Sequence, residues 1–230
     1  LITGFAMPGG LATNGSKLSI TTANAVAGVM REAEAFVVPT SSKYKTINDL
    51  LADIKANPKS IAIGGGNYGG VDHVTVATLA ATVGVKATDL NYIPYSGGGS
   101  LVPDVIGGRV AVGVSGTSEF ASFVKAGKLR VLALSSPKRL KSIKGQTLTA
   151  QGINFVFGNW RGVLAPASLT EAERINWLKV VDVTRAGDAW KATLVAQDWQ
   201  NQTDYGKDFA AFLDSQKKDV TATLVSLGLA

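Results

Sequence analysis

The chain of 230 residues contains no cysteine and a single histidine, His73, and aromatic residues make up only 7% of it. The lack of cysteine excludes disulfides, a thiol nucleophile and cysteine-bound zinc or iron–sulfur centres. With one histidine, a metal site would have to be built almost entirely from oxygen ligands. No apolar run approaches the roughly 20 residues that a membrane span requires. We therefore expect a soluble protein that carries neither a metal nor a cofactor.

Charge is also sparse, because Asp, Glu, Lys and Arg together make up 17% of the residues, against 46% hydrophobic residues. That apolar content is sufficient for a core, either in one large domain or in two small ones. The formal charge is +6, and the densest basic stretch is "SPKRLKSIKG", with Lys138, Arg139, Lys141 and Lys144. Nucleic-acid binding would require aromatic or helical support. We therefore interpret the stretch as a solvated loop and expect no nucleic-acid partner.

Strand-like and helix-like patterns alternate five times between residues 34 and 136, which predicts an α/β fold with a largely parallel sheet covered by helices. One of these helices, in "TINDLLADIKANP", should begin with a capping box made by Thr46 and Asp49. The strand segments are "EAFVVP", "SIAIG", "LNYIPY", "RVAVGVSG" and "KLRVLALSS", and the helix segments are "TINDLLADIKANP", "VDHVTVATLAATVG", "LVPDVIGG" and "TSEFASFVKAG".

The pattern changes near residue 158, because a strand with Trp160 and Arg161 is followed by helices at 170–186, around "DAWKATLVAQ" and at 205–228. We therefore predict two crossovers between domains, one near residue 34 and one near residue 158. Residues 1–34 plus 158–230 would form a discontinuous first domain. Residues 35–157 would form a second domain inserted into it.

Three loops of small residues follow predicted strands, at 64–70, 96–100 and 115–117. Ligands of parallel α/β sheets bind beyond the carboxyl ends of the strands. The three loops therefore predict one common binding site.

The first loop, in "IAIGGGNYGGVDH", contains the spacing G-x-G-x-x-G at Gly64, Gly66 and Gly69. A dinucleotide fold also needs an acid at the end of the next strand, whereas Asp89 precedes the strand "LNYIPY". No Gly-Lys-Ser/Thr follows the glycines, so the loop is not a P-loop. Bare backbone before a helix is still suited to a small anion.

The spacing of the serine, histidine and acidic residues does not indicate a catalytic site. Neither Ser96 nor Ser115 lies in a G-x-S-x-G elbow. His73 could be a ligand donor or a structural residue, and Asp72 would complement the dipole of its helix. The carboxylate pairs Glu32 with Glu34 and Asp72 with Glu119 are expected to be surface or helix-end charges. We predict that the protein is not an enzyme.

Taken together, several segments resemble the substrate-binding receptors of tripartite tricarboxylate transporters, the TctC and Bordetella-uptake (Bug) family. The resemblance covers the chain from about Leu1 to Pro166 and is closest to the tricarboxylate branch through "SGTSE" and "NWRG". The segments that carry it are "EAFVVPTSSKYKTINDLLADIKANP", "IGGGNYGGVDH", "NYIPYSGGGSLVPDVIGGRVAVGVSGTSEF", "VKAGKLRVLALSSPKRL" and "NWRGVLAP".

The resemblance implies a two-domain clamshell of the type II periplasmic-binding-protein class, which captures a small di- or tricarboxylate, citrate-like, and delivers it to the permease subunits of a membrane transporter. It implies a periplasmic location, and we expect a monomer. The implied ligand-binding residues, held largely through backbone N–H groups, are Gly64, Gly66, Asn67, Tyr68, Gly69, His73, Ser96, Gly97, Gly98, Ser115 and Gly116.

The family's opening strand and its Pro-Gly-Gly loop ending in an acid have no counterpart here, because "AMPGGLATN" at 6–14 matches a later region. We therefore expect that an N-terminal segment, together with a signal peptide, is absent from this chain. Two alternatives stay open: a nucleotide-dependent α/β enzyme that uses the G-x-G-x-x-G loop, and the effector-binding domain of a transcription regulator.

Overall fold

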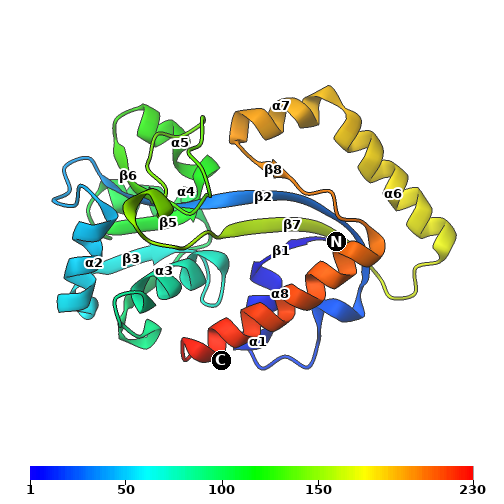
Figure 1. The fold of residues 1–230 in the computed structure, drawn as a ribbon, viewed down its shortest axis with the longest axis horizontal. Helices are drawn as coiled ribbons and strands as arrows, with labels where there is room; N and C mark the ends of the chain where they lie inside the picture. The colour runs from blue at the N-terminus through cyan, green and yellow to red at the C-terminus, as the bar shows by residue number, and fades with distance from the viewer. Residues whose placement is uncertain (230) are drawn as a thin grey trace.

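A computed structural model describes residues 1–229, and one long strand, β2, runs through most of its length (Figure 1). The strands are β1 (Ile2–Gly4), β2 (Asn24–Pro39), β3 (Ala62–Gly65), β4 (Asn91–Pro94), β5 (Val112–Gly116), β6 (Leu129–Leu134), β7 (Gly158–Ala165) and β8 (Gln200–Asn201). The α-helices are α1 (Ala6–Thr13), α2 (Ile47–Ala56), α3 (Val71–Ala81), α4 (Gly98–Ile106), α5 (Thr117–Lys125), α6 (Glu171–Ala186), α7 (Asp188–Gln197) and α8 (Gly206–Ser226). No helix in the described part of the chain is long and apolar enough to cross a membrane.

The strand β2 exchanges its partners in the middle. Its first half pairs with β7 as far as Ala33 opposite Gly158, and its second half pairs with β5 starting from Glu34 opposite Gly116. β8 and β6 pair with the other edge of the same two halves. The single strand β2 therefore belongs to both halves of the sheet.

The sheet is mixed, so the prediction of a mostly parallel sheet in each domain is only partly right. β3 pairs in parallel with β4 and β5, since α3 and α4 supply the crossovers that parallel pairing requires. β2 runs antiparallel to β5, β6, β7 and β8, and β1 runs antiparallel to β7. The strand β2 lies between β5 and β6 in one half of the sheet and between β7 and β8 in the other half. Helices connect the two strands of each pair, and β2 runs in the opposite direction to both of them.

The predicted helices are present. The capping box of α2 is formed as expected, with the Asp49 N–H donating to the Thr46 hydroxyl at 3.2 Å and the Thr46 N–H donating to the Asp49 carboxylate at 2.8 Å. Its buried face consists of Ile47, Leu50, Leu51 and Ile54, the apolar face predicted from the helical spacing.

One helix, α1, was not predicted from the sequence. It contains Pro8, Gly9 and Gly10, which are poor residues for a helix interior. Pro8 lies in the first turn, where its missing N–H is tolerated. Gly9 lies directly against the Gly69 carbonyl, so close that a Cβ atom there would collide with it. Tertiary contact with the glycine loop therefore outweighs the low helix propensity.

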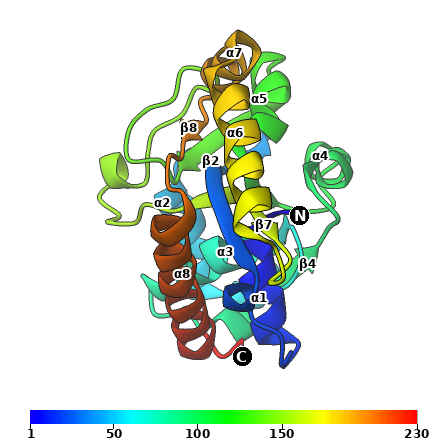
Figure 2. The same ribbon diagram turned by 90° about the vertical axis from the view of Figure 1, so that its right-hand side faces the viewer.

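Separate hydrophobic clusters lie beneath the two halves of β2. One cluster contains Phe36, Ile63 and Leu79, all at most 1% exposed. Another contains Trp160 and Phe209 and packs α8 against β7. Burying side chains of this size contributes about 1.5–3 kcal/mol each. In the turned view, α8 and α6 lie on either side of β2 (Figure 2).

Candidate functional site

The three predicted loops follow neighbouring strands. In the sheet, β3 lies between β4 and β5 and is parallel to both, so their carboxyl ends meet at one edge. The helix α3 begins at Val71, directly after the first loop, whereas α4 begins at Gly98 within the second predicted loop. The third predicted loop is a direct junction, because β5 ends at Gly116 and α5 begins at Thr117. A hydrogen bond of 2.7 Å from the Tyr95 N–H to the Gly65 carbonyl joins the first two loops. The sequence pattern thus located one edge of the sheet correctly, although it did not establish what binds there.

The glycine loop is held by the first turn of α3, because two side chains of that turn accept hydrogen bonds from N–H groups of the loop. The Gly66 N–H donates to the Asp72 carboxylate at 2.7 Å, and the Gly69 N–H donates to His73 Nδ1 at 3.0 Å. Gly64 is buried against Leu101, where a Cβ atom would not fit. The predicted anion cradle of Gly64, Gly66 and Gly69 is therefore largely an internal structure here.

His73 belongs to this internal structure. Its ring lies 4.3 Å from that of Tyr92 and 5.1 Å from that of Tyr68, and the side chain is 2% exposed. Burial lowers the pKa of His73 to about 4, so the imidazole is neutral near pH 7. The outward-facing residues of the loop are Asn67 and Tyr68, and the Tyr68 side chain is 56% exposed.

The second and third loops differ in exposure. Ser96 is exposed and lies 3.2 Å from the Ser100 hydroxyl, and Gly97 has a φ of 148°, a backbone conformation that favours glycine. Gly98 is buried, as are Ser115 and Gly116. Of the predicted site residues, the polar side chains that reach solvent are Asn67, Tyr68 and Ser96.

Four carboxylates gather where these loops meet β2, and we refer to Glu32, Glu34, Asp72 and Glu119 as the acidic junction. The sequence interpretation of these acids as surface or helix-end charges is wrong for Glu34, which is 0% exposed on β2. Asp72 lies at a helix end as predicted, in the first turn of α3, but it is only 5% exposed. Side chains two apart on a strand point to the same face, and this spacing in "REAEAF" was the available signal for Glu32 and Glu34.

One glycine from each loop makes room for one of these acids. A Cβ atom on Gly66 would lie 3.1 Å from Asp72 Oδ2, and one on Gly116 would lie 2.8 Å from the Glu32 Cδ. The third pair is Gly98 with Glu119, where an added Cβ would lie 2.7 Å from the carboxyl carbon. The glycines predicted to approach a ligand therefore approach carboxylates of the protein itself.

Glu34 is the innermost member of the acidic junction. The partner of its carboxyl among residues 1–229 is the Asp72 carboxyl, to which it can donate when it is protonated. Burial raises the pKa of Glu34 well above its ordinary value, and the charges of Asp72 and Glu32 raise it further. Burial also raises the pKa of Asp72, although the Gly66 N–H opposes this effect. The low-dielectric surroundings thus favour the protonated form of these carboxyls.

Arg161, on β7, is the basic residue beside the acidic junction. It donates a hydrogen bond of 2.6 Å to Asn159 Oδ1 and lies against Gly4. Its positive charge lowers the pKa of Asp72 and Glu119, although burial has the larger effect and raises the pKa of both.

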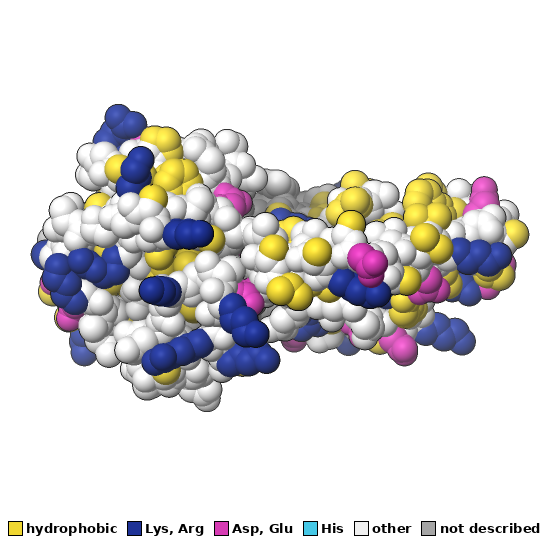
Figure 3. Space-filling model, turned by 90° about the horizontal axis from the view of Figure 1, so that it is seen from above, with side chains coloured by type: hydrophobic (Ala, Val, Ile, Leu, Met, Phe, Trp, Pro, Cys, Tyr) yellow, Lys and Arg dark blue, Asp and Glu magenta, His cyan; other side chains and the backbone are white. Residues whose placement is uncertain are grey.

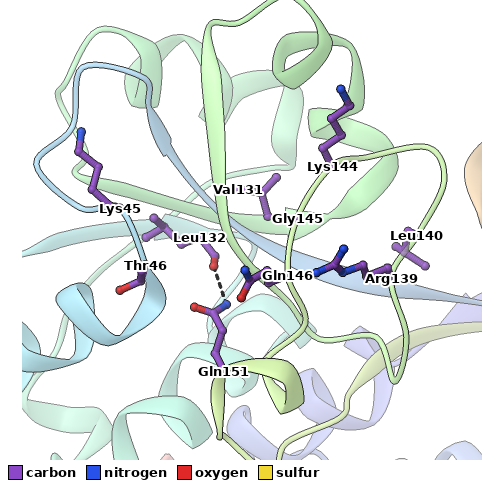
Figure 4. A pocket seen from close by; sticks show the side chains of 10 residues that line it. All are labelled: Lys45, Thr46, Val131, Leu132, Arg139, Leu140, Lys144, Gly145, Gln146 and Gln151. Atoms are coloured by element: carbon purple, nitrogen blue, oxygen red, sulfur yellow. Dashed lines mark hydrogen bonds between the residues drawn. The ribbon is translucent and has the colours of Figure 1, made fainter.

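A second polar region, which we call the basic cavity, lies away from the predicted loops (Figure 4). It has a volume of about 580 Å³. Lys45 and Lys144 extend outward on opposite sides of it, and the Arg139 guanidinium turns toward Gln146 (Figure 4). Its lining residues are Lys45, Thr46, Val131, Leu132, Arg139, Leu140, Lys144, Gly145, Gln146 and Gln151. The basic stretch "SPKRLKSIKG" is solvated as predicted, since Lys138, Arg139, Lys141 and Lys144 are all exposed.

Comparison with known proteins identifies the family. The family described as "Tripartite tricarboxylate transporter family receptor" matches residues 14–227. The chain belongs to this family. It is a family of transport receptors and not of enzymes, which confirms the prediction made from the sequence. Solved proteins of similar fold include a TctC solute-binding protein and the periplasmic binding protein BugD.

Individual relatives are distant in sequence. A UPF0065 protein in the gbd 5' region of Cupriavidus necator is 29% identical over 200 residues, which cover 84% of this chain and 58% of that protein. Protein BugT of Bordetella pertussis is 30% identical over 134 residues, covering 56% of this chain and 40% of BugT. The matched part of the chain thus spans 58% of the first relative and 40% of the second.

Solved structures share the fold. A periplasmic transporter protein superposes with a TM-score of 0.85 at 22% identity, covering 97% of this chain and 76% of that chain. MatC from Rhodopseudomonas palustris with bound malate gives a TM-score of 0.83 at 14% identity and covers 97% and 78%. A further R. palustris protein with adipate gives 0.79 at 18% identity and covers 90% and 69%. The predicted α/β clamshell of the periplasmic binding proteins is confirmed.

Proposed function

We propose that the protein is a periplasmic receptor that captures a small di- or tricarboxylate and delivers it to the permease subunits of a tripartite tricarboxylate transporter. Family membership over residues 14–227 carries the proposal. Malate and adipate in two proteins of the same fold support a small carboxylate as ligand. The receptor would act as a monomer.

The ligand would bind at the carboxyl edge of β4, β3 and β5, on the loops that contain Asn67, Tyr68 and Ser96. These side chains are exposed and follow adjacent parallel strands. Backbone N–H groups that have no partner inside the loops would donate to the carboxylate. Gly66 and Gly69 would position the loop, because their own N–H groups already have acceptors.

Two domains would close over this ligand, one comprising residues 1–34 plus 158–230 and the other residues 35–157. The partner exchange of β2 between Ala33 and Glu34, opposite Gly158 and Gly116, supports these boundaries. The separate hydrophobic clusters around Phe36 and Trp160 support them as well. Closure would be a hinge motion at the exchange point.

Isothermal titration calorimetry with malate, succinate and citrate tests the proposal. We expect at least one of them to bind, and Asn67→Ala to weaken that binding several-fold. Asn91→Ala is the matched control, because Asn91 is also exposed but lies at the amino-terminal end of β4, away from the three loops. Absence of heat with any carboxylate, or equal effects of the two variants, would contradict the proposed site.

A further inference from the structure

The basic cavity is a hollow that the proposed carboxylate site does not use. It has a volume of about 580 Å³, and its charged lining residues are Lys45, Arg139 and Lys144. No acid is among its lining residues, and none of these three forms an ion pair within residues 1–229. The nearby Asp49 accepts the Lys45 N–H at 2.8 Å as part of the cap of α2. Three cationic groups therefore surround one cavity that contains no countercharge.

The loop that carries Arg139 and Lys144 is fixed to the rest of the molecule. Ile143 is 2% exposed and packs in a hydrophobic cluster that also contains residues of β6. The Ser142 N–H donates to the carboxylate of Asp198, which lies directly after α7. A loop that is already ordered loses little conformational entropy when a partner binds. Its basic side chains are therefore presented from a preformed surface.

Positive charge is concentrated in the proposed second domain. Residues 35–157 contain thirteen Lys and Arg against six Asp and Glu, whereas the remainder of the chain contains ten against eleven. Two of the six acids, Asp53 and Asp104, pair with Lys43 and Arg109 and not with the cavity. A surface with an excess of one charge attracts partners of the opposite charge and accelerates their association. The partner that complements this domain is acidic.

The arrangement of the basic side chains favours an extended acidic partner over a compact anion. Lys45 and Lys144 extend outward on opposite sides of the cavity, and the Arg139 guanidinium turns toward Gln146 (Figure 4). A compact anion such as phosphate requires donors that converge on one point. Basic groups that point apart instead match carboxylates spaced along a peptide. The lining also includes Val131, which provides apolar contact between the charges.

We propose that the basic cavity is the docking site for an acidic segment of a partner protein, whose carboxylates pair with Lys45, Arg139 and Lys144. This inference rests on the function proposed above, in which the partner is a permease subunit, and it adds the chemistry of that contact. None of the three loops at the sheet edge lines the cavity. The receptor therefore holds its carboxylate and docks through separate surfaces.

Two fluorescent peptides test this chemistry with the intact chain, an octapeptide of glutamate and a neutral octapeptide of glutamine. Fluorescence anisotropy measures their binding at pH 7. We expect the glutamate peptide to bind and the glutamine peptide not to bind. Affinity for the glutamate peptide should fall at least tenfold between about 0.01 M and about 1 M salt, because the Debye length decreases from about 30 to about 3 Å.

A pair of double variants assigns this binding to the cavity. Arg139→Glu combined with Lys144→Glu should weaken binding of the glutamate peptide about tenfold, since each lost pair of exposed charges changes affinity a few-fold. Lys217→Glu combined with Lys218→Glu is the matched control, because these exposed residues of α8 undergo the same change of charge in the other proposed domain. Far-UV circular dichroism and a thermal midpoint verify that both variants are folded.

Several outcomes would overturn the docking site. Equal binding of the two peptides, or an equal loss in the two double variants, would show attraction to net charge alone. Full displacement of the glutamate peptide by about 1 mM phosphate at constant ionic strength would make the cavity a site for a small anion. Tighter binding to phosphatidylglycerol vesicles, lost in the Arg139 and Lys144 double variant, would assign the cavity to a membrane surface.

The calorimetry with malate, succinate and citrate separates this inference from the function on which it rests. Absence of glutamate-peptide binding together with intact carboxylate binding would overturn the docking site and leave the receptor standing. Absence of carboxylate binding together with peptide binding that depends on Arg139 and Lys144 would contradict the proposed receptor function and support the acidic contact.

Discussion

The acidic junction and the basic cavity differ in charge and in exposure, because two of the four acids are buried whereas the lysines and the arginine of the basic cavity are all exposed. Residues 35–157 contain more than twice as many basic as acidic residues, and many Lys and Arg side chains are visible on the left-hand part of Figure 3. The acids of the junction, in contrast, include two side chains that are 0% and 5% exposed. Exposed charges are screened by water and salt, whereas buried ones are not. The buried carboxyls should therefore affect stability more than the exposed basic residues do.

Titration of His73 provides the largest expected effect. Burial lowers its pKa to about 4 from an ordinary value of 6.5, which corresponds to roughly 3 kcal/mol of stability. Because the folded-state pKa is the lower one, this contribution is complete above pH 6.5 and is lost as the pH falls toward 4. Since the chain has one histidine, NMR of the imidazole protons reports the value directly. A pKa of His73 near 6.5 in the folded protein would contradict its burial. It would show that the glycine loop is exposed to water, as the basic cavity is.

A pair of adjacent glycines gives the next largest effect. Gly98→Ala would place a Cβ atom 2.8 Å from the Glu119 Cβ, whereas an added Cβ on Gly99 meets nothing within 4 Å. We expect the first change to lower the free energy of unfolding by about 1–3 kcal/mol, as overpacking does. Gly99→Ala should leave it unchanged or raise it slightly, because alanine favours helix. Urea denaturation measures both, and equal effects would contradict the close packing of Glu119.

The pH dependence of stability should change when Glu34 becomes glutamine. Burial and the charges of Asp72, Glu32 and Glu119 raise the folded-state pKa of Glu34 above its ordinary value of 4.5. Its contribution to stability is therefore complete below pH 4.5 and is lost as the pH rises through the folded-state pKa. We expect Glu34→Gln to be more stable relative to the unaltered protein at pH 8 than at pH 4. A difference that is independent of pH would show that Glu34 is not a buried carboxyl.

The smallest effects are expected in the basic cavity. Arg139→Glu and Lys144→Glu alter exposed side chains, so the free energy of unfolding should change by no more than about 0.5 kcal/mol. Carboxylate affinity should also stay the same in calorimetry. A marked loss of affinity in either variant would indicate that the anion binds in the basic cavity and not at the sheet edge. It would then be the exposed basic residues that control binding.

The sequence was sufficient where structure depends on local pattern. The capping box of Thr46 and Asp49, the alternation of strands and helices and the position of three loops at one sheet edge all depend on neighbours in the chain. The family pattern of loops was equally readable, because its segments occur in order. Helix α1 was missed because its support comes from a contact between Gly9 and Gly69, which are distant in sequence.

The acidic junction could not be derived from the sequence for the same physical reason. Glu34, Asp72 and Glu119 are each separated by about 40 residues or more. The pairing of β2 with β5, and of β5 with β3, brings them together. Without that topology, each acid had an ordinary local explanation. The antiparallel pairing of β2 could not be predicted either, because the residue pattern of a strand does not show in which direction its neighbours run.

The close contacts between glycines and acids have a consequence for how this protein can change over evolution. In the pairs Gly98 with Glu119 and Gly116 with Glu32, an added Cβ and the acid would compete for one volume, whereas Gly66 and Asp72 would only be in tight contact. A relative that gains a side chain at Gly98 or Gly116 must move, shorten or lose the facing acid, so the two positions should vary together. Relatives that keep all three glycines but lose the acids would hold vacant space at the same edge, and there a bulkier ligand would fit.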